Sequence, residues 1–93
     1  ALLCPMLDAR RMEVYAAVYD RALNVKRAIA ADIVDENSYL EFLNEAPVYF
    51  YGNGAAKCRE KIIHPNAHFI DDIQKKQLPG KIIKTWPTSN LST

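Results

Sequence analysis

The residues that could carry chemistry in this 93-residue chain stand in a few small groups, the first of which is a glycine-rich turn. Gly52-Asn53-Gly54 follows a dense apolar run at residues 48–51 and precedes a segment with helical spacing, Ala55 to Ile63. A glycine-rich turn between a strand and a helix can place backbone amides around a phosphate. This turn lacks a third glycine and the Lys-Ser/Thr of a phosphate-binding loop, so a tight turn that needs positive φ is the alternative interpretation.

Two histidines form the second group. His64 and His68 are four residues apart, a spacing that on a helix would place both imidazoles on one face as metal ligands. Pro65 lies between them and favours a loop, and no third ligand follows at a suitable distance. We therefore expect no metal site here, and we expect the acidic pair at 71–72 to be solvated surface.

The third group is a run of alternating charges, Asp8, Arg10, Arg11 and Glu13. Arg10 or Arg11 could bind a substrate, or the charges could form ion pairs that fix a hairpin. We take Asp8, Arg10 and Glu13 as candidate structural or partner contacts. No Ser/His/Asp or Cys/His arrangement is present, so the residues indicate no catalytic group.

Composition limits the class of protein. The chain is 49% hydrophobic and 25% charged, and no apolar run approaches the roughly 18 residues of a membrane span. The first residues have no basic region of the kind that opens a signal peptide, so we expect a soluble, cytoplasmic protein without a membrane contact. In that compartment Cys4 and Cys58 are expected to be free and buried.

The net charge of +1 hides a division of the chain. Residues 1–73 hold eight basic and eleven acidic side chains, whereas residues 74–93 hold four lysines and no acid. The lysines suggest a tail that binds nucleic acid or a membrane surface, although Trp86 is the only aromatic residue there for base stacking.

The elements that must position these groups are predicted from hydrophobic periodicity. Leu2 to Leu7 and Glu13 to Asp20 are expected to form a hairpin, with the second strand in the sheet interior and covered on both faces. A strand at Val25 to Val34 is favoured over a helix because of its β-branched residues.

A helix is predicted next, from the capping box Ser38-Tyr39-Leu40-Glu41 to a point before Pro47. The strand at residues 48–51 and the helix Ala55 to Ile63 follow. The order is β, β, β, α, β, α, so the predicted fold is α/β with about four strands, the first three antiparallel, and two helices.

Three short elements in this order resemble the second half of the TsaB family, also called YeaZ. They are Asp8-Ala9-Arg10, Glu13-Val14-Tyr15 and the Gly-Asn-Gly turn, and the resemblance continues at Val34-Asp35-Glu36 and His64-Pro65-Asn66-Ala67. It covers residues 1 to about 74. The elements are specific together, although each is weak alone.

The resemblance implies the second lobe of an actin-like, Hsp70-like ATPase fold of the RNase H-like type. It also implies a non-catalytic scaffold that pairs with TsaD-like and TsaE-like subunits to make N6-threonylcarbamoyladenosine at position 37 of tRNA. Direct tRNA binding by this chain is not expected. The resemblance implies no cofactor beyond a vestigial nucleotide contact at Gly52, Asn53 and Gly54. The alternatives are an M22-like metallopeptidase (glycoprotease), as older family labels state, or a nucleic-acid module that uses the basic tail.

The chain departs from the family pattern in two ways. One is at its end, where a non-family tail at 74–93 follows the lobe at 1–73, and the other is at its beginning. The family's first lobe would precede residue 1, and without it exposed apolar surface should drive self-association into a homo-oligomer. The family would end in a motif like V-A-Y-F-E-P-F-Y. A one-base shift of frame in codons for Trp86 to Thr93 permits that motif, which suggests a tail translated out of the ancestral frame.

Overall fold

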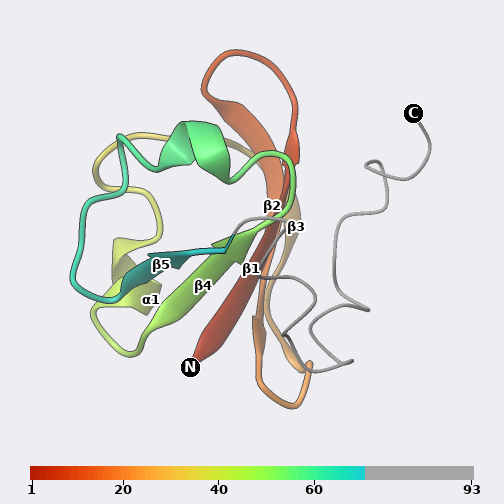
Figure 1. The fold of residues 1–93 in the computed structure, drawn as a ribbon. Coiled ribbons are helices and arrows are strands. Elements are labelled where there is room, and N and C mark those ends of the chain that lie inside the picture. Colours follow the sequence, from red (N-terminus) through yellow and green to blue (C-terminus); the bar gives the residue numbers. More distant parts are fainter. Residues whose placement is uncertain (71–93) are drawn as a thin grey trace.

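The computed structural model describes residues 1–70 as a five-stranded mixed sheet with short helical segments on one side (Figure 1). The strands are β1 (Leu2–Asp8), β2 (Glu13–Asp20), β3 (Val25–Ile33), β4 (Val48–Tyr51) and β5 (Ala67–Phe69). They lie in the order β3-β2-β1-β4-β5. The α/β class is confirmed, as is the antiparallel pairing of the first three strands. The prediction of about four strands is wrong, because β5 adds a fifth.

The sequence did not predict how the strands in the parallel half of the sheet pair with one another. β4 lies parallel to β1, with Leu2 opposite Val48 and Pro5 opposite Tyr51, and β5 lies parallel to β4. β5 has only three residues, so its period-2 pattern is too short to be recognised in the sequence. The carboxyl ends of β1, β4 and β5 therefore meet at one end of the sheet.

The two predicted helices are much shorter than expected. α1 spans Leu40–Leu43, and the segment after β4 contains only the 3₁₀ turn η1 (Ala56–Cys58). The predicted capping box is wrong, because Tyr39 has a left-handed backbone (φ 64°) that separates Ser38 from the helix. The Ser38 hydroxyl instead accepts a hydrogen bond from the Asp35 amide at 2.9 Å. No helix within residues 1–70 is long and apolar enough to pass through a membrane.

The main hydrophobic core lies between one face of the sheet and these helical segments. Val14, Ala16 and Val18 on β2 are fully buried on this face, and Leu43 of α1 and Cys58 of η1 belong to the same cluster. On the opposite face the Tyr15 side chain is 48% exposed. The prediction that both faces of β2 are covered is therefore wrong at this position.

A polar cluster closes the core beneath β3. Arg27 donates to Asp32 at 2.6 Å and to the Ala16 carbonyl at 2.7 Å, while the Tyr39 hydroxyl donates to the same Asp32 carboxylate at 2.7 Å. Burial disfavours the charge on Arg27, but the hydrogen bond and charge of Asp32 outweigh it, so the pKa of Arg27 is raised. The Asp32 carboxylate is thus bound from the core side of the sheet by Arg27 and Tyr39.

We predict that Tyr39→Phe lowers the free energy of unfolding by about 1–2 kcal/mol, because Asp32 loses a hydrogen-bond donor in a partly buried site. Urea unfolding followed by circular dichroism measures the change. Tyr15→Phe removes a hydroxyl from an exposed ring and is the matched control, which should stay within about 0.5 kcal/mol of the wild-type chain. Equal effects of the two substitutions would contradict the role of the polar cluster.

Candidate functional site

The Gly-Asn-Gly turn continues the pairing of β1 with β4 beyond the end of β4. The Gly54 amide donates to the Met6 carbonyl at 3.1 Å, and the Asp8 amide donates to the Asn53 side-chain oxygen at 2.7 Å. The Asn53 carboxamide thus takes the place that a backbone carbonyl would have in the ladder. The turn is therefore bound along the carboxyl end of β1.

Both glycines of this turn are needed by the backbone, for different reasons. Gly52 has φ 98°, a conformation that side chains disfavour. A Cβ on Gly54 would lie 2.9 Å from the Asp8 nitrogen and 2.9 Å from the Leu7 carbonyl carbon. The tight-turn interpretation therefore has a direct physical basis, while the nucleotide contact at Gly52, Asn53 and Gly54 stays a prediction.

Lys57 joins the turn to the β1–β2 hairpin. Its ammonium group donates to the Asp8 carboxylate and, at 2.8 Å, to the Glu13 backbone carbonyl. Asp8, Glu13 and Asn53 are thereby brought together, although 40 positions separate Glu13 from Asn53. Sequence reasoning missed Lys57, because a contact between residues so far apart leaves no local pattern.

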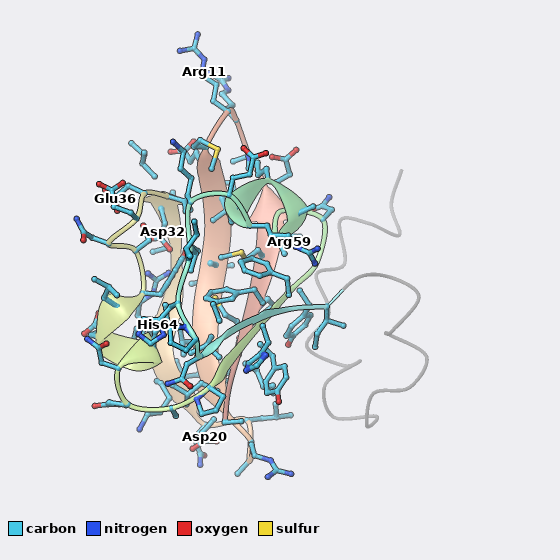
Figure 2. The ribbon with its side chains drawn as sticks, turned by 60° about the vertical axis from the view of Figure 1, so that its left-hand side comes forward. Arg11, Asp20, Asp32, Glu36, Arg59 and His64 are labelled. Carbon is cyan, nitrogen blue, oxygen red and sulfur yellow. The ribbon has the colours of Figure 1, made fainter. Side chains whose placement is uncertain are left out.

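Arg10 and Arg11 lie outside this network, at the tip of the hairpin. Both are exposed, Arg11 has φ 45°, and its side chain points away from the sheet (Figure 2). The Glu13 amide donates to the Arg10 carbonyl at 2.6 Å, which closes the turn. Neither arginine takes part in an ion pair within residues 1–70, so the ion pair that steadies the hairpin reaches to Lys57 instead.

A small pocket of about 180 Å³ adjoins the turn at the carboxyl ends of β4 and β5. Its lining includes Gly52, Asn53, Arg59 and Phe69. The Arg59 guanidinium lies over the Phe69 ring, 5.5 Å from its centroid. The carboxyl ends of parallel strands are the usual place for ligands in α/β sheets. The pocket thus offers one cation and the edge of a tight turn to a small ligand.

The two histidines have separate partners. The Asn66 amide donates to His64 Nδ1 at 3.0 Å, so Nε2 carries the proton and donates to the Asn44 side-chain oxygen at 3.2 Å. The His68 ring stacks on Tyr49 with centroids 5.0 Å apart. Within residues 1–70 no group of three or more His, Cys, Asp or Glu side chains is placed to hold a metal ion.

Cys4 and Cys58 are free and buried, as predicted. Burial raises the pKa of Cys4, and it raises the pKa of Cys58 to about 11 against the opposing effect of the Lys57 charge. The Cys58 thiol contacts the Gly54 carbonyl at 3.4 Å. Both thiols are therefore held neutral inside the core and are poor nucleophiles at neutral pH.

Comparison of the chain with protein-family models, with curated proteins and with solved structures found no match. The acidic pair at 71–72, the lysines at 75, 76, 81 and 84 and the rest of the predicted tail lie outside the described residues. The site must therefore be interpreted from its own geometry.

We predict that Gly54→Ala lowers the free energy of unfolding by more than about 2 kcal/mol, because the backbone of β1 would have to move to make room for the methyl group. Asn53→Ala should cost about 1 kcal/mol through the loss of one hydrogen bond. Urea unfolding measures both. Lys57→Ala removes a partly exposed ion pair and serves as the control, with the smallest effect of the three. The reverse ranking would show that charge, not backbone approach, holds the turn.

The cysteines generate a pH prediction. A thiol whose pKa is about 11 in the folded chain and 9.0 when unfolded favours folding below pH 9, and that contribution is lost as the pH rises through 11. Stability should therefore fall more steeply between pH 9 and 10 for the wild-type chain than for Cys58→Ala.

At pH 8 an aromatic disulfide reagent should label neither Cys4 nor Cys58 until urea is added. Rapid labelling of the folded chain would contradict this description of the core.

Proposed function

We propose that the chain is a non-catalytic scaffold that corresponds to the second lobe of the TsaB family. In this proposal the chain acts in the tRNA N6-threonylcarbamoyladenosine machinery. The observation that carries the proposal is the convergence of the three family-like elements at one place. Asp8 and Glu13 belong to one hairpin, and the Gly-Asn-Gly turn lies about 40 positions later in the sequence. The hairpin and the turn meet around Lys57. Elements that resemble one family and also contact one another are more specific than the same elements scattered over a fold.

The order of the elements supports the same proposal. Three antiparallel strands are followed by α1 and a crossover to β4, which pairs with β1 in parallel. The resemblance implies this sequence of strands and helix. That this sheet is the lobe of an actin-like fold is part of the proposal, since similar mixed sheets occur in proteins of unrelated function.

The β1–β2 hairpin tip is the part of this site that a partner protein could reach. Its base is held by Lys57, and its backbone is closed by the bond from the Glu13 amide to the Arg10 carbonyl. Arg10 and Arg11 project from this fixed base without ion-pair partners among residues 1–70. A positively charged tip on a rigid base suits an acidic surface on a partner protein, and in this proposal that partner is the TsaD-like subunit.

A scaffold role needs no bound nucleotide. The Gly54 amide, a donor that could otherwise face a phosphate, is used to bind the Met6 carbonyl of β1. A vestigial nucleotide contact would have to use the remaining groups of the turn together with Arg59 in the adjacent pocket.

We predict that the chain binds a purified TsaD-like subunit and that Arg10→Glu weakens the binding at least about tenfold, which corresponds to about 1.4 kcal/mol. Isothermal titration calorimetry measures the dissociation constant. Arg21→Glu is the matched control, since Arg21 is also exposed but follows β2 at the opposite end of the sheet, where Figure 2 labels Asp20.

The control should bind as the wild-type chain does, and both variants should unfold at the same urea concentration as the wild type. No binding of the wild-type chain to the TsaD-like subunit would contradict the proposed function. Equal weakening by both charge reversals would contradict the location of the interface at the hairpin tip.

A further inference from the structure

β3 is the long free edge of the sheet, and its side chains are unusually apolar for an edge. β3 pairs only with β2 among the described strands (Figure 1). Ile29 is 66% exposed and Ile33 is 78% exposed, and Ala30 and Ala31 between them are exposed as well. An exposed edge with apolar side chains is a template for pairing with another strand.

The usual protection of an edge strand is missing from the second half of β3. The register with β2 shifts between Ala16 and Val18 and again between Val18 and Tyr19, so the bulges lie before Ala30. From Ala30 to Ile33 the pairing is regular. Bulges discourage pairing only where they distort the edge, so residues 30–33 remain competent for it.

The backbone groups of this half point outward. The Val34 amide donates to the Met12 carbonyl at 2.9 Å, which directs position 34 toward β2. Backbone groups alternate in direction along an antiparallel strand, so those of Ala31 and Ile33 face the free edge. Asp32, the one charge in the segment, is bound by Arg27 and Tyr39 on the core side.

We propose that two copies of the chain form a symmetric dimer by antiparallel pairing of their β3 edges, with the two-fold axis at Ala31. In this register Ile29 lies opposite Ile33 of the second copy, and the reverse pair forms across the axis. Two backbone hydrogen bonds join the facing Ala31 residues, and the outward backbone groups of Ile33 in each copy extend the pairing on both sides of the axis. The small Ala31 side chains at the axis leave the isoleucines free to pack.

The charges at the ends of β3 favour this register. The beginning of the strand carries the exposed Lys26, and exposed Asp35 and Glu36 follow its end. Figure 2 shows Glu36 at the periphery of the molecule. Antiparallel pairing about Ala31 places the end of β3 that carries Lys26 in each copy beside the end that Asp35 and Glu36 follow in the other. Opposite charges thus meet at both ends, whereas parallel pairing would bring like charges together.

The proposal goes beyond the scaffold function and does not depend on it, because it rests on β3 alone. The oligomeric state of the full chain tests it by sedimentation equilibrium over a concentration series. We expect a reversible monomer–dimer equilibrium. A chain that stays monomeric at every concentration, or that forms open-ended assemblies larger than a dimer, overturns the proposal.

Ala31→Pro tests the backbone pairing, because it removes an amide that points to the free edge and leaves the bonds to β2 in place. We expect it to raise the dimer dissociation constant at least about tenfold. Ile29→Lys should do the same. Ile63→Lys is the matched control, since Ile63 is 83% exposed and lies outside β3. Equal effects at positions 29 and 63 would show non-specific association and overturn the proposal.

Charge reversal tests the register. Lys26→Glu should weaken the dimer at low salt, and the double variant Lys26→Glu with Glu36→Lys should restore it, because both contacts are re-formed with exchanged signs. Failure of the double variant to recover affinity overturns this register.

A cross-link tests the axis. Facing Cα atoms of a hydrogen-bonded antiparallel pair are about 5.5 Å apart, within the range of a disulfide. Ala31→Cys should therefore form an intermolecular disulfide on mild oxidation, while the buried Cys4 and Cys58 do not interfere. Ala28→Cys is the control, because its copies would be six positions, or about 20 Å, out of register. Equal cross-linking of the two variants overturns the axis at Ala31.

Discussion

The close approach of Gly54 to the end of β1 is the constraint on which this end of the molecule depends. There is no room for a Cβ between Gly54 and the backbone of Leu7 and Asp8. The approach lets the Gly54 amide reach Met6 and places Asn53 opposite the Asp8 amide. It also brings Lys57, three residues later, within reach of the β1–β2 hairpin. The segment that follows β4 is thereby held against the β1–β2 hairpin by backbone and side-chain contacts.

The sequence predicts the strands well because their patterns are local. The alternation at 13–20 and the β-branched residues at 25–34 suffice to locate β2 and β3, and their bounds agree with the structure within a residue. The helices are predicted less well. The Ser38 to Glu41 pattern indicates a capping box, but the left-handed Tyr39 redirects Ser38 to Asp35. A tyrosine is not a residue type that indicates a left-handed backbone, so the sequence carries no signal of it.

In the candidate site, too, the sequence predicts the local features but not the contacts between them. Gly52, Asn53 and Gly54 are recognisable as a turn from composition alone, and Asp8 and Glu13 as members of a charged run. Their meeting at Lys57 depends on the register between β1 and β4, which no local pattern encodes. The edge surface on β3 is similar, because its exposure follows from the strand order and not from Ile29 or Ile33 themselves.

The sheet thus has two surfaces with different chemistry, the apolar edge at β3 and the tip of the β1–β2 hairpin. The hairpin tip is polar and positively charged, and its base is held by Lys57, which suits a protein partner of opposite charge. The most direct test of the scaffold account is hydrogen–deuterium exchange of the chain with and without a TsaD-like subunit. The account predicts slower exchange at residues 8–13 and in the Gly-Asn-Gly turn when the subunit is present. Unchanged exchange throughout these residues at saturating subunit would contradict it.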